Sequence, residues 1–439
     1  MKLTIYGAGY VGLVTGICFA KMGHTVCCVD IDATKINMLK QGNLPIYEEN
    51  LEDLLHESQK LGRIQFITDF QYAVNFSEIQ IIAVGTPPRS DGSANLEYVV
   101  AVAEMIGKLI SGYCCIVNKS TVPTGTAKLV KNIIQNQLKM RNENIVFDVI
   151  SNPEFLREGS AVKDCLAPDR IVIGYENDRA LKIMQQLYEP LIQKNHAFIS
   201  MDFASAELTK YAANVFLATK VSFINEISQI AERVGANIHA IKRGIGSDSR
   251  INEKFLNAGC GFGGSCFPKD ILALKNIAMQ NHYEPHILNA VLKTNDQQQK
   301  IIFHKITHYF ERNLKNKIIA IWGLSFKPNT DDVRSASSCV LMKMLWDAGT
   351  IVQAYDPMAM KNIRTIYPDQ DKLILLDDAK SVLKNADALV IMTEWNEFKS
   401  FNLATIKATL KFPVIFDGRN IIDSATAKKM GFDYFGIGC

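Results

Sequence analysis

The sequence predicts an α/β protein built from two doubly wound domains, which are joined by a long central helix and a small helical region. Three observations lead to this prediction. A strand, a glycine-rich turn, a helix and a second strand follow one another over residues 2–30. A strand, a loop, a helix and a strand again follow one another over residues 317–356, without the glycine motif. Between the two, residues 204–234 contain neither proline nor glycine and have the pattern of one continuous helix.

Length and composition agree with this architecture. The chain has 439 residues, of which 48% are hydrophobic and 21% charged, as in ordinary globular proteins. We expect an N-terminal nucleotide-binding domain over 1–200, a central helical region over 201–310 and a C-terminal domain over 311–439. The net charge of +3 is too small to predict a nucleic-acid or membrane partner.

The sequence shows no sign of export. Met1 leads directly into a predicted strand, which leaves no room for a signal peptide, and no apolar run is long enough to span a bilayer. The ten cysteines have neither a disulfide-framework nor a zinc-site spacing, so we expect a cytoplasmic protein without a metal site. Six cysteines lie in apolar runs and are predicted to be core residues: Cys18, Cys27, Cys28, Cys114, Cys115 and Cys339.

The first domain begins with a dinucleotide-binding pattern. Residues 2–6 and 25–29 are the first two predicted strands, and Asp30 follows the second. The turn after the first strand carries the three glycines of a Gly-x-Gly-x-x-Gly motif: Gly7, Gly9 and Gly12. Such glycines permit a tight turn and let a pyrophosphate approach the helix N-terminus, while the acidic residue binds a ribose hydroxyl. The sequence therefore predicts a dinucleotide site.

Asp30 also indicates which dinucleotide binds. A carboxylate there would repel the 2′-phosphate of NADP, so the sequence favours NAD. Lys35 follows shortly afterwards, and it lies either beside the adenosine ribose or in solvent. Several further strands end in small or hydroxylated residues, where ligands bind in open α/β sheets. The further strands predicted for this domain cover residues 79–84, 114–118, 145–150, 170–174 and 197–200.

The central helix carries a polar pair in apolar surroundings. Lys210 and Asn214 are four residues apart and therefore share one helical face. A lysine among apolar neighbours is a candidate for acid–base chemistry, but it also reaches solvent by extending its side chain. The sequence leaves both interpretations of Lys210 open.

Cys266 lies in the most informative segment, Gly-Phe-Gly-Gly-Ser-Cys-Phe-Pro-Lys-Asp at residues 261–270. Pro268 suits the first turn of a helix, so the thiol is predicted near a helix N-terminus, where unpaired N–H groups favour a thiolate. A cysteine in this setting is a candidate nucleophile, provided that polar partners come from elsewhere. Taken alone, it is more often a small buried apolar residue.

The C-terminal part repeats the order of the first domain without its Gly-x-Gly-x-x-Gly motif. Predicted helices over 271–279 and 286–310 lead to it, and Asp356 follows its second strand. Its predicted strands cover residues 317–322, 351–355, 373–376, 388–392 and 414–417. Three basic residues at strand ends either bind phosphate or are ordinary surface cations: Lys327, Arg334 and Arg419.

Taken together, these segments resemble the UDP-glucose/GDP-mannose dehydrogenase family over nearly the whole chain. The segments that carry the resemblance are Gly-Ala-Gly-Tyr-Val-Gly from Gly7, Gly-Thr-Pro from Gly85, Lys-Ser-Thr-Val-Pro from Lys119, Asn-Pro-Glu-Phe-Leu-Arg-Glu-Gly from Asn152, Glu-Leu-Thr-Lys-Tyr-Ala-Ala-Asn from Glu207, the cysteine segment, and Phe-Lys-Pro-Asn-Thr-Asp-Asp-Val-Arg from Phe326. The resemblance implies two Rossmann-like domains, NAD as cofactor, UDP-glucose as substrate and a homodimer. The segment around Pro45 and Ser335-Ala336-Ser337 depart from the usual family form.

The resemblance also implies a four-electron oxidation of UDP-glucose to UDP-glucuronate. Cys266 would capture the aldehyde as a thiohemiacetal and then carry a thioester. Lys210 and Asn214 would hold the sugar 6-oxygen, and Glu154 would act as acid or base in thioester hydrolysis. The catalytic residues implied in this way are Cys266, Lys210, Asn214, Glu154, Asp270 and Thr121.

Binding residues follow from the same resemblance, and Thr121 and Asp270 would order a water. The implied NAD contacts are Gly7, Gly9, Tyr10, Val11, Gly12, Asp30, Lys35, Thr86, Thr121, Glu158, Lys269 and Arg334. The implied substrate contacts are Glu154, Phe155, Leu156, Lys210, Asn214, Phe255, Gly263, Lys327, Arg419 and, from a neighbouring subunit, Arg250.

Three alternatives remain at the level of sequence. The same chemistry could act on GDP-mannose or a UDP-N-acetylhexosamine, although the N-acetyl enzymes of the family usually carry histidine where Ser265 stands. A two-electron NAD dehydrogenase would use Cys266 only structurally. A catalytically silent nucleotide-binding regulator would be natural if Lys210, Glu154 or Cys266 were missing, and all three are present.

Overall fold

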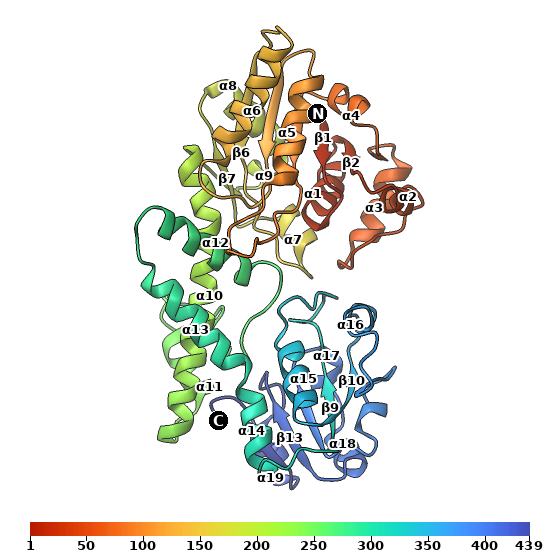
Figure 1. Cartoon of the computed structure of the whole chain (residues 1–439), viewed down its shortest axis with the longest axis vertical. Helices are drawn as coiled ribbons and strands as arrows, with labels where there is room; N and C mark the ends of the chain where they lie inside the picture. Colours follow the sequence, from red (N-terminus) through yellow and green to blue (C-terminus); the bar gives the residue numbers. More distant parts are fainter. The chain divides into compact units, whose positions relative to one another are not determined.

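The computed structural model describes all 439 residues, and they form two compact units, each with one sheet that has helices on both faces (Figure 1). The first unit comprises Met1–Ala213 and Leu272–Tyr283, and the second comprises Asn214–Ile271 and Glu284–Cys439. The prediction of two Rossmann-like domains that the chain joins through a long helix is confirmed.

The sheet of the first unit has eight strands in the order β3-β2-β1-β4-β5-β6-β7-β8. Their bounds are β1 (Lys2–Tyr6), β2 (Thr25–Val29), β3 (Ile64–Ile67), β4 (Ile79–Ile82), β5 (Cys114–Asn118), β6 (Phe147–Ser151), β7 (Arg170–Gly174) and β8 (Ala197–Met201). β1 pairs in parallel with both β2 and β4, so the strand order reverses there, at the edge where such sheets bind ligands. β7 runs antiparallel to β6, and β8 returns parallel to β7.

Helices cover both faces of this sheet because its strands are apolar on both sides. Ile5 packs into the core beneath α1, α3, α7, α8 and α9, whereas Tyr6 faces the core beneath α4, α5 and α6. The helix bounds are α1 (Tyr10–Lys21), α2 (Ala33–Lys40), α3 (Leu51–Lys60), α4 (Phe70–Phe76), α5 (Glu97–Leu109), α6 (Thr126–Met140), α7 (Ala161–Leu166), α8 (Asp178–Leu187) and α9 (Glu189–Ile192).

The predicted central helix is α10 (Phe203–Val234), 32 residues without a break. At ~1.5 Å per residue it is about 48 Å long. Its first residues belong to the first unit and the rest, from Asn214, to the second. Glu207 is 1% exposed and anchors the helix, because its carboxylate accepts the Gly125 and Ala127 N–H groups at 2.6 and 2.7 Å, at the start of α6.

The second unit repeats the strand order of the first, as β11-β10-β9-β12-β13-β14, with every pair parallel. Its strands are β9 (Ile318–Trp322), β10 (Ile351–Tyr355), β11 (Leu373–Leu375), β12 (Ala388–Ile391), β13 (Val414–Asp417) and β14 (Asp433–Phe435). Its helices are α11 (Ile238–Gly246), α13 (His286–Gln299), α14 (Ile301–Tyr309), α15 (Ser337–Asp347), α16 (Met360–Ile366), η1 (Ser381–Leu383), α17 (Asn396–Lys399), α18 (Leu403–Thr409) and α19 (Ser424–Lys429); α12 (Phe267–Gln280) starts in this unit and ends in the first.

The structure corrects several details of the sequence prediction. The short strands β3 and β14 were not predicted, and the helix expected over 286–310 is divided at Lys300 into α13 and α14. Five of the six cysteines predicted as core are buried, but Cys339 is half-buried. None of the helices combines the length and the apolar character that crossing a membrane requires.

Candidate functional site

The glycine turn after β1 has the geometry of a dinucleotide loop. Gly7 has φ +102°, a left-handed conformation that favours glycine. A Cβ at Gly12 would lie 1.9 Å from the Gly7 carbonyl oxygen, so the third glycine allows α1 to pack against the turn. A Cβ at Gly9 would meet no atom within 4 Å. The space beside Gly9 is therefore open for a pyrophosphate, at the start of α1.

Asp30 is placed beside this turn by the parallel pairing of β1 and β2. One of its carboxylate oxygens accepts the Ala8 N–H at 2.7 Å, and the other accepts the Asp32 N–H at 3.0 Å. The Lys35 ammonium lies 3.4 Å from the same carboxylate, so Lys35 is not simply a solvated lysine. Both side chains lie at the carboxyl end of β2, which fits the recognition of an adenosine ribose.

Two threonines follow β4 and β5 and meet at the same edge of the sheet. The Thr86 hydroxyl donates to the Thr121 carbonyl oxygen at 2.7 Å, and Thr86 is 8% exposed. Gly85 leaves open space, because a Cβ there would meet nothing within 4 Å. The structure thus brings together the Gly-Thr-Pro and Lys-Ser-Thr-Val-Pro segments that the sequence singled out separately.

A buried ion pair lies beyond the end of β6. The Lys210 ammonium is 3.0 Å from the Glu154 carboxylate, and the two side chains are only 4% and 6% exposed. The ammonium also lies 5.3 Å from the centre of the Phe155 ring, whose other partner is the Arg170 guanidinium at 3.8 Å. Lys210 is therefore buried and paired, which excludes the solvent-exposed alternative.

The cysteine loop is closely packed on its glycine side. Gly261 and Gly264 have φ +89° and +84°. A Cβ at Gly263 would lie 2.2 Å from the Ser335 carbonyl oxygen, and one at Gly264 would lie 2.7 Å from the Phe326 ring. The Gly264 N–H donates to the Arg334 carbonyl oxygen at 2.8 Å. Glycine is required at these positions because the loop lies directly against the segment after β9.

Four buried or half-buried side-chain amides fix the loop from the other side: Asn225, Asn295, Gln298 and Gln299. Asn295 forms two hydrogen bonds with Phe262, accepting its N–H at 2.8 Å and donating to its carbonyl oxygen at 3.1 Å. The run from Asn295 to Gln299 on α13 was the sequence signal for this role, because amides that become buried must find partners.

Cys266 immediately precedes α12, as predicted. Its carbonyl oxygen accepts the Asp270 N–H at 2.8 Å, which closes the first helical turn, and the side chain is half-buried. Ser265 Oγ lies 3.5 Å from the sulfur. Cys260, six residues earlier, is fully buried, and burial raises the pKa of its thiol. Of the two cysteines in this loop, Cys266 is the candidate nucleophile, because it is only half-buried and lies at the start of a helix.

Asp270 follows Cys266 by one helical turn and is buried. Its carboxylate accepts hydrogen bonds from two side chains. Its carboxylate accepts the Asn214 amide at 2.6 Å and the Lys269 ammonium at 2.5 Å, and it is 1% exposed. Lys210 and Asn214 thus each pair with a predicted catalytic carboxylate. Lys269, predicted to contact NAD, directs its ammonium to Asp270.

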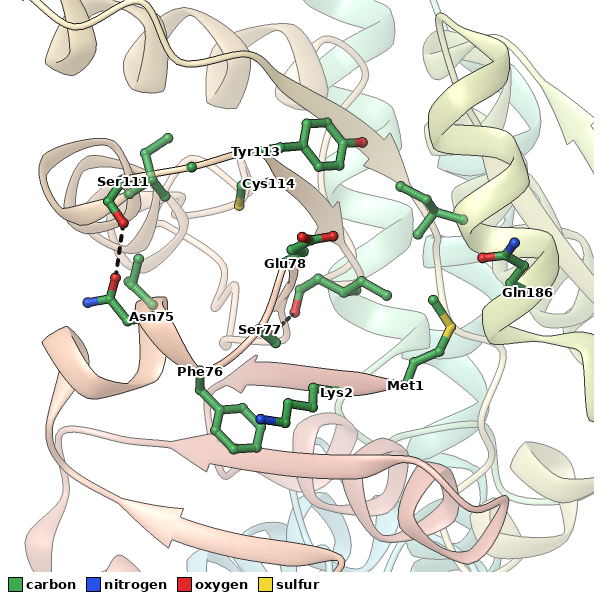
Figure 2. A pocket seen from close by; sticks show the side chains of 15 residues that line it. Met1, Lys2, Asn75, Phe76, Ser77, Glu78, Ser111, Tyr113, Cys114 and Gln186 are labelled. Carbon is green, nitrogen blue, oxygen red and sulfur yellow. Dashed lines mark hydrogen bonds between the residues drawn. The ribbon is translucent and has the colours of Figure 1, made fainter.

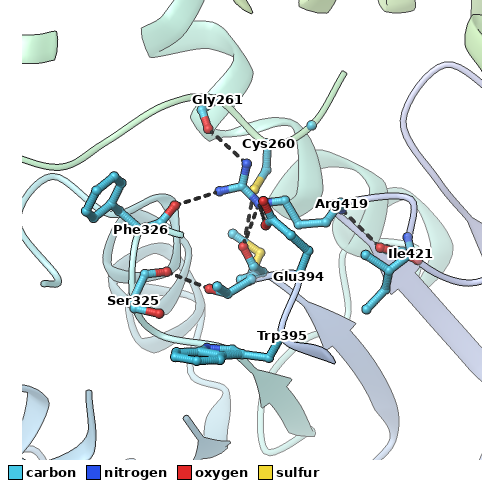
Figure 3. Close-up of polar contacts among 12 residues, drawn as sticks. Cys260, Gly261, Ser325, Phe326, Glu394, Trp395, Arg419 and Ile421 are labelled. Carbon is cyan, nitrogen blue, oxygen red and sulfur yellow. Dashed lines mark hydrogen bonds and ion pairs between the residues drawn. The ribbon is translucent and has the colours of Figure 1, made fainter. Parts of the chain in front are cut away.

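Arg419 lies at the carboxyl end of β13, within a network of loop carbonyls (Figure 3). Its guanidinium donates to Met392, Phe326 and Gly261 carbonyl oxygens at 2.8, 3.2 and 3.4 Å. It borders a cavity of about 330 Å³ that Leu256, Asn257 and Ala258 also line.

Asp417 holds the turn that carries Arg419. Its carboxylate accepts the Arg419, Ile421 and Ile422 N–H groups at 3.0, 2.9 and 2.9 Å. Burial raises the pKa of Asp417. This role of Asp417 was not among the sequence predictions, although an aspartate that ends a strand before a glycine is a signal for it.

The remaining predicted substrate contacts are more dispersed. Phe255 has φ +65° and its ring lies 6.4 Å from that of Phe267, beside the cysteine loop. The Lys327 ammonium lies 5.4 Å from the Phe326 ring. The Arg334 guanidinium pairs with Asp332 at 2.7 Å. Arg250 is 86% exposed and pairs with Asp248 at 2.6 Å, so the structure does not place it with the other substrate residues.

A second cavity lies away from all of these residues. It has a volume of about 600 Å³ and opens at the amino ends of β1, β4 and β5, opposite the glycine turn (Figure 2). Lys2, Glu78 and Tyr113 are among its lining residues. None of the predicted site residues lines it.

Comparison with known proteins gives matches over the whole chain. Residues 1–192, 204–297 and 320–424 match the NAD binding domain, the central domain and the UDP binding domain of the UDP-glucose/GDP-mannose dehydrogenase family. The chain is 46% identical to UDP-glucose 6-dehydrogenase TuaD of Bacillus subtilis (100% of this chain, 93% of the relative) and 43% identical to a UDP-glucose 6-dehydrogenase of Pseudomonas aeruginosa (100% and 97%). The solved structure of a UDP-glucose dehydrogenase from Pyrobaculum islandicum superposes with a TM-score of 0.91 at 35% identity, covering 100% of this chain and 97% of that one.

The open space at Gly9 gives a direct test of the dinucleotide site. Gly9→Ala should fold normally, because φ is −81° and the new methyl group meets no protein atom. It should nevertheless weaken NAD binding at least about tenfold, because the methyl group occupies the space for the pyrophosphate. Titration of NAD by calorimetry measures this effect.

Gly112→Ala is the matched control for that variant. A Cβ at Gly112 also meets nothing within 4 Å, but Gly112 lines the cavity at the opposite edge of the sheet. This variant should bind NAD like the unmodified chain. Equal NAD affinity of both variants would contradict the placement of the pyrophosphate beside Gly9.

Proposed function

Because the chain belongs to the UDP-glucose/GDP-mannose dehydrogenase family, we propose that it oxidises UDP-glucose to UDP-glucuronate with NAD. The observation that carries this proposal is the place of Cys266, in a closely packed glycine loop at the start of α12. A simple alcohol oxidation has no use for a thiol held in this way. An oxidation that continues from alcohol to acid does, because the aldehyde must be retained between the two steps.

The first unit supports cofactor binding. Gly9 leaves room for a pyrophosphate, and Asp30, Lys35, Thr86 and Thr121 line the same edge of the sheet. The Asp30 carboxylate disfavours a 2′-phosphate, which supports NAD rather than NADP. NAD, when bound, accepts one hydride in each of the two oxidation steps. Glu158 completes the proposed contacts of the first unit, and Lys269 and Arg334 are further proposed NAD contacts.

Cys266 provides covalent capture in this mechanism. Its thiolate adds to the aldehyde carbon, and the carbonyl oxygen takes up a proton, which gives a thiohemiacetal. That carbon would then give up a hydride, for which NAD would be the acceptor, and its hydroxyl would release a proton to water, which leaves a thioester. Lys210 and Asn214 are proposed to stabilise the oxygen as it gains negative charge, because both are buried donors.

Hydrolysis of the thioester requires a base and then an acid. We assign both roles to Glu154, whose carboxylate is paired with Lys210 at 3.0 Å and is held by the Leu156 N–H at 2.5 Å. It takes a proton from the attacking water as that water adds to the thioester, and it returns a proton to the departing Cys266 sulfur. Thr121 and Asp270 are assigned to ordering the water.

UDP-glucose is favoured over the other nucleotide sugars by the relatives. Those that are 43% and 46% identical over the whole chain are UDP-glucose 6-dehydrogenases. In the second unit, Phe255, Gly263, Lys327 and Arg419 are proposed to contact the UDP portion. In the first unit, Phe155 and Leu156 follow Glu154 and are proposed to contact the sugar.

We also propose a homodimer that forms through α10. Four large apolar side chains lie seven or four residues apart along this helix and are 51–70% exposed: Phe216, Phe223, Ile230 and Val234. An exposed apolar stripe with this spacing is typical of a helix that packs against another helix. A second copy of the chain is the natural partner, because a symmetric dimer brings the same stripe to itself.

In this dimer, Arg250 would lie near the interface and could contact the neighbouring subunit. Lys220 lies on α10 between Phe216 and Phe223, and its ammonium donates to the Ile251 and Asn252 carbonyl oxygens at 2.8 and 3.2 Å. These hydrogen bonds therefore hold the turn that carries Arg250 against α10, beside the apolar stripe. Its position supports the proposal that Arg250 reaches the substrate of the neighbouring subunit.

A reducing compartment, and hence the cytoplasm, is the proposed location. The structure contains ten cysteines and no disulfide. A chain with this many thiols and no disulfide fits a compartment that keeps cysteine reduced.

The proposed reaction fixes the yield of reduced cofactor. Each UDP-glucose should give two NADH and one UDP-glucuronate, because two hydrides leave the same carbon. The measurement is NADH absorbance at completion with limiting nucleotide sugar, with GDP-mannose and a UDP-N-acetylhexosamine as parallel substrates. A yield near one NADH per UDP-glucose, or no turnover of UDP-glucose, would contradict the proposal.

Replacing the thiol separates cofactor binding from acid formation. Cys266→Ser should keep its NAD affinity and lose UDP-glucuronate formation by at least about a thousandfold, because a serine hydroxyl is a far weaker nucleophile for the aldehyde. Cys339→Ser, at another half-buried cysteine of the second unit, should stay active. Full activity of Cys266→Ser would refute the thioester route.

The apolar stripe can be tested by one charged substitution. Phe223→Asp should convert the dimer into a monomer, because it buries a carboxylate at the centre of the proposed interface. Light scattering during size-exclusion chromatography measures the mass. Ile366→Asp is the control, since Ile366 is 50% exposed at the end of α16. A dimer that survives Phe223→Asp would place the interface elsewhere.

A further inference from the structure

Glu48 is a buried carboxylate that links two separate parts of the proposed NAD site. It is 4% exposed, although it lies between the helices α2 and α3 rather than in a strand or helix of its own. One oxygen accepts the Ala161 N–H at 2.7 Å. The other accepts the Gly159 N–H at 2.6 Å and the hydroxyl of Tyr10. Three donors therefore compensate the buried charge.

The partners of Glu48 belong to two segments that are assigned to NAD. Tyr10 is the first residue of α1 and directly follows Gly9, where the pyrophosphate is placed. Gly159 directly follows Glu158 and has φ +78°. The Tyr10 hydroxyl oxygen also accepts the Gly159 N–H at 3.3 Å. The two segments are 149 residues apart in sequence, and Glu48 and Tyr10 together hold them in one arrangement.

The protonation states support this arrangement. Burial, together with the hydrogen bond to Glu48, raises the pKa of Tyr10 far above its usual range. The Tyr10 hydroxyl therefore remains a donor at every physiological pH. A charged acceptor makes such hydrogen bonds stronger than those between neutral groups.

We propose that Glu48 is a positioning residue for the cofactor, which fixes the glycine turn and the Glu158 loop relative to each other before NAD binds. This inference rests on the proposed NAD site. Free of this link, each segment would have to be ordered by NAD itself, and that ordering would reduce the affinity. Phe155 and Leu156, the proposed sugar contacts, precede the Glu158 loop in the same segment, so we expect a smaller effect on UDP-glucose than on the cofactor.

Glu48→Gln tests the proposal, because it keeps the size of the side chain but replaces one accepting oxygen by an NH₂ group. We expect the Kd for NAD to rise about tenfold, as for the loss of a charge-assisted hydrogen bond, and the Kd for UDP-glucose to change much less. Both are measured by calorimetry on the full chain without turnover. The result therefore does not depend on whether UDP-glucose is oxidised.

Glu207→Gln is the matched control. Glu207 is likewise a buried glutamate that accepts two backbone N–H groups at 2.6 and 2.7 Å beside the first residues of a helix. It should lower the melting temperature, as Glu48→Gln does, but leave the Kd for NAD unchanged. Equal effects of the two variants on NAD affinity would overturn the proposal, since Glu48 would then act only on stability.

Tyr10→Phe keeps the test decisive if Glu48→Gln does not fold. It removes one hydroxyl from the network and retains the ring, and it should weaken NAD binding several-fold with a much smaller effect on UDP-glucose affinity. In the double variant, Tyr10→Phe should add little to Glu48→Gln, because both disrupt the same link. Unaltered NAD affinity of Tyr10→Phe, or fully additive effects, would contradict the positioning role.

Discussion

Parallel strand pairing is the constraint on which both nucleotide domains depend. Since β1 pairs in parallel with β2 and β4, the three strands end at one edge, and the loops that follow them must meet there. Gly7, Asp30 and Thr86 come together for this reason alone. The same pairing of β9 with β10 and β12 places Asp356 and Thr393 beside the turn after β9. Side chains assigned to ligands are carried by loops, but the sheet determines which loops are neighbours.

In each domain an aspartate follows the second strand, but the two aspartates have different roles. Asp30 accepts the Ala8 N–H in the glycine turn and remains at the edge, where its side chain is 12% exposed. Asp356 is completely buried, and its carboxylate accepts the N–H groups of Leu324 and Ser325 and the Trp395 indole N–H at 2.7, 3.0 and 3.1 Å. With its oxygens already occupied, Asp356 has a structural role. The second domain must therefore recognise its nucleotide through other groups, such as the basic residues at its strand ends.

Local pattern was enough to predict the two sheets, the central helix and the position of Cys266, because short apolar strands followed by turn residues, a helical run without proline or glycine, and Pro268 are all visible in sequence. It was not enough for the residues that hold the site. Glu48, Asn225 and Asp417 act on backbone groups of segments that are distant in sequence or carry no pattern, and periodicity contains no information about such contacts. The interpretation of Lys210 was left open for the same reason, since its pairing with Glu154 joins residues that are far apart in the chain.

The close packing of the cysteine loop connects the proposed UDP contacts to the thiol. Gly263 and Gly264 lie against Ser335 and Phe326 with no room for a methyl group. The segment they touch also carries Lys327, and Arg419 donates to both Gly261 and Phe326. The proposed UDP contacts Lys327 and Arg419 are therefore attached to the same backbone against which the cysteine loop packs. Close packing leaves little room for these two segments to shift independently, so one packed unit holds both the proposed UDP contacts and Cys266.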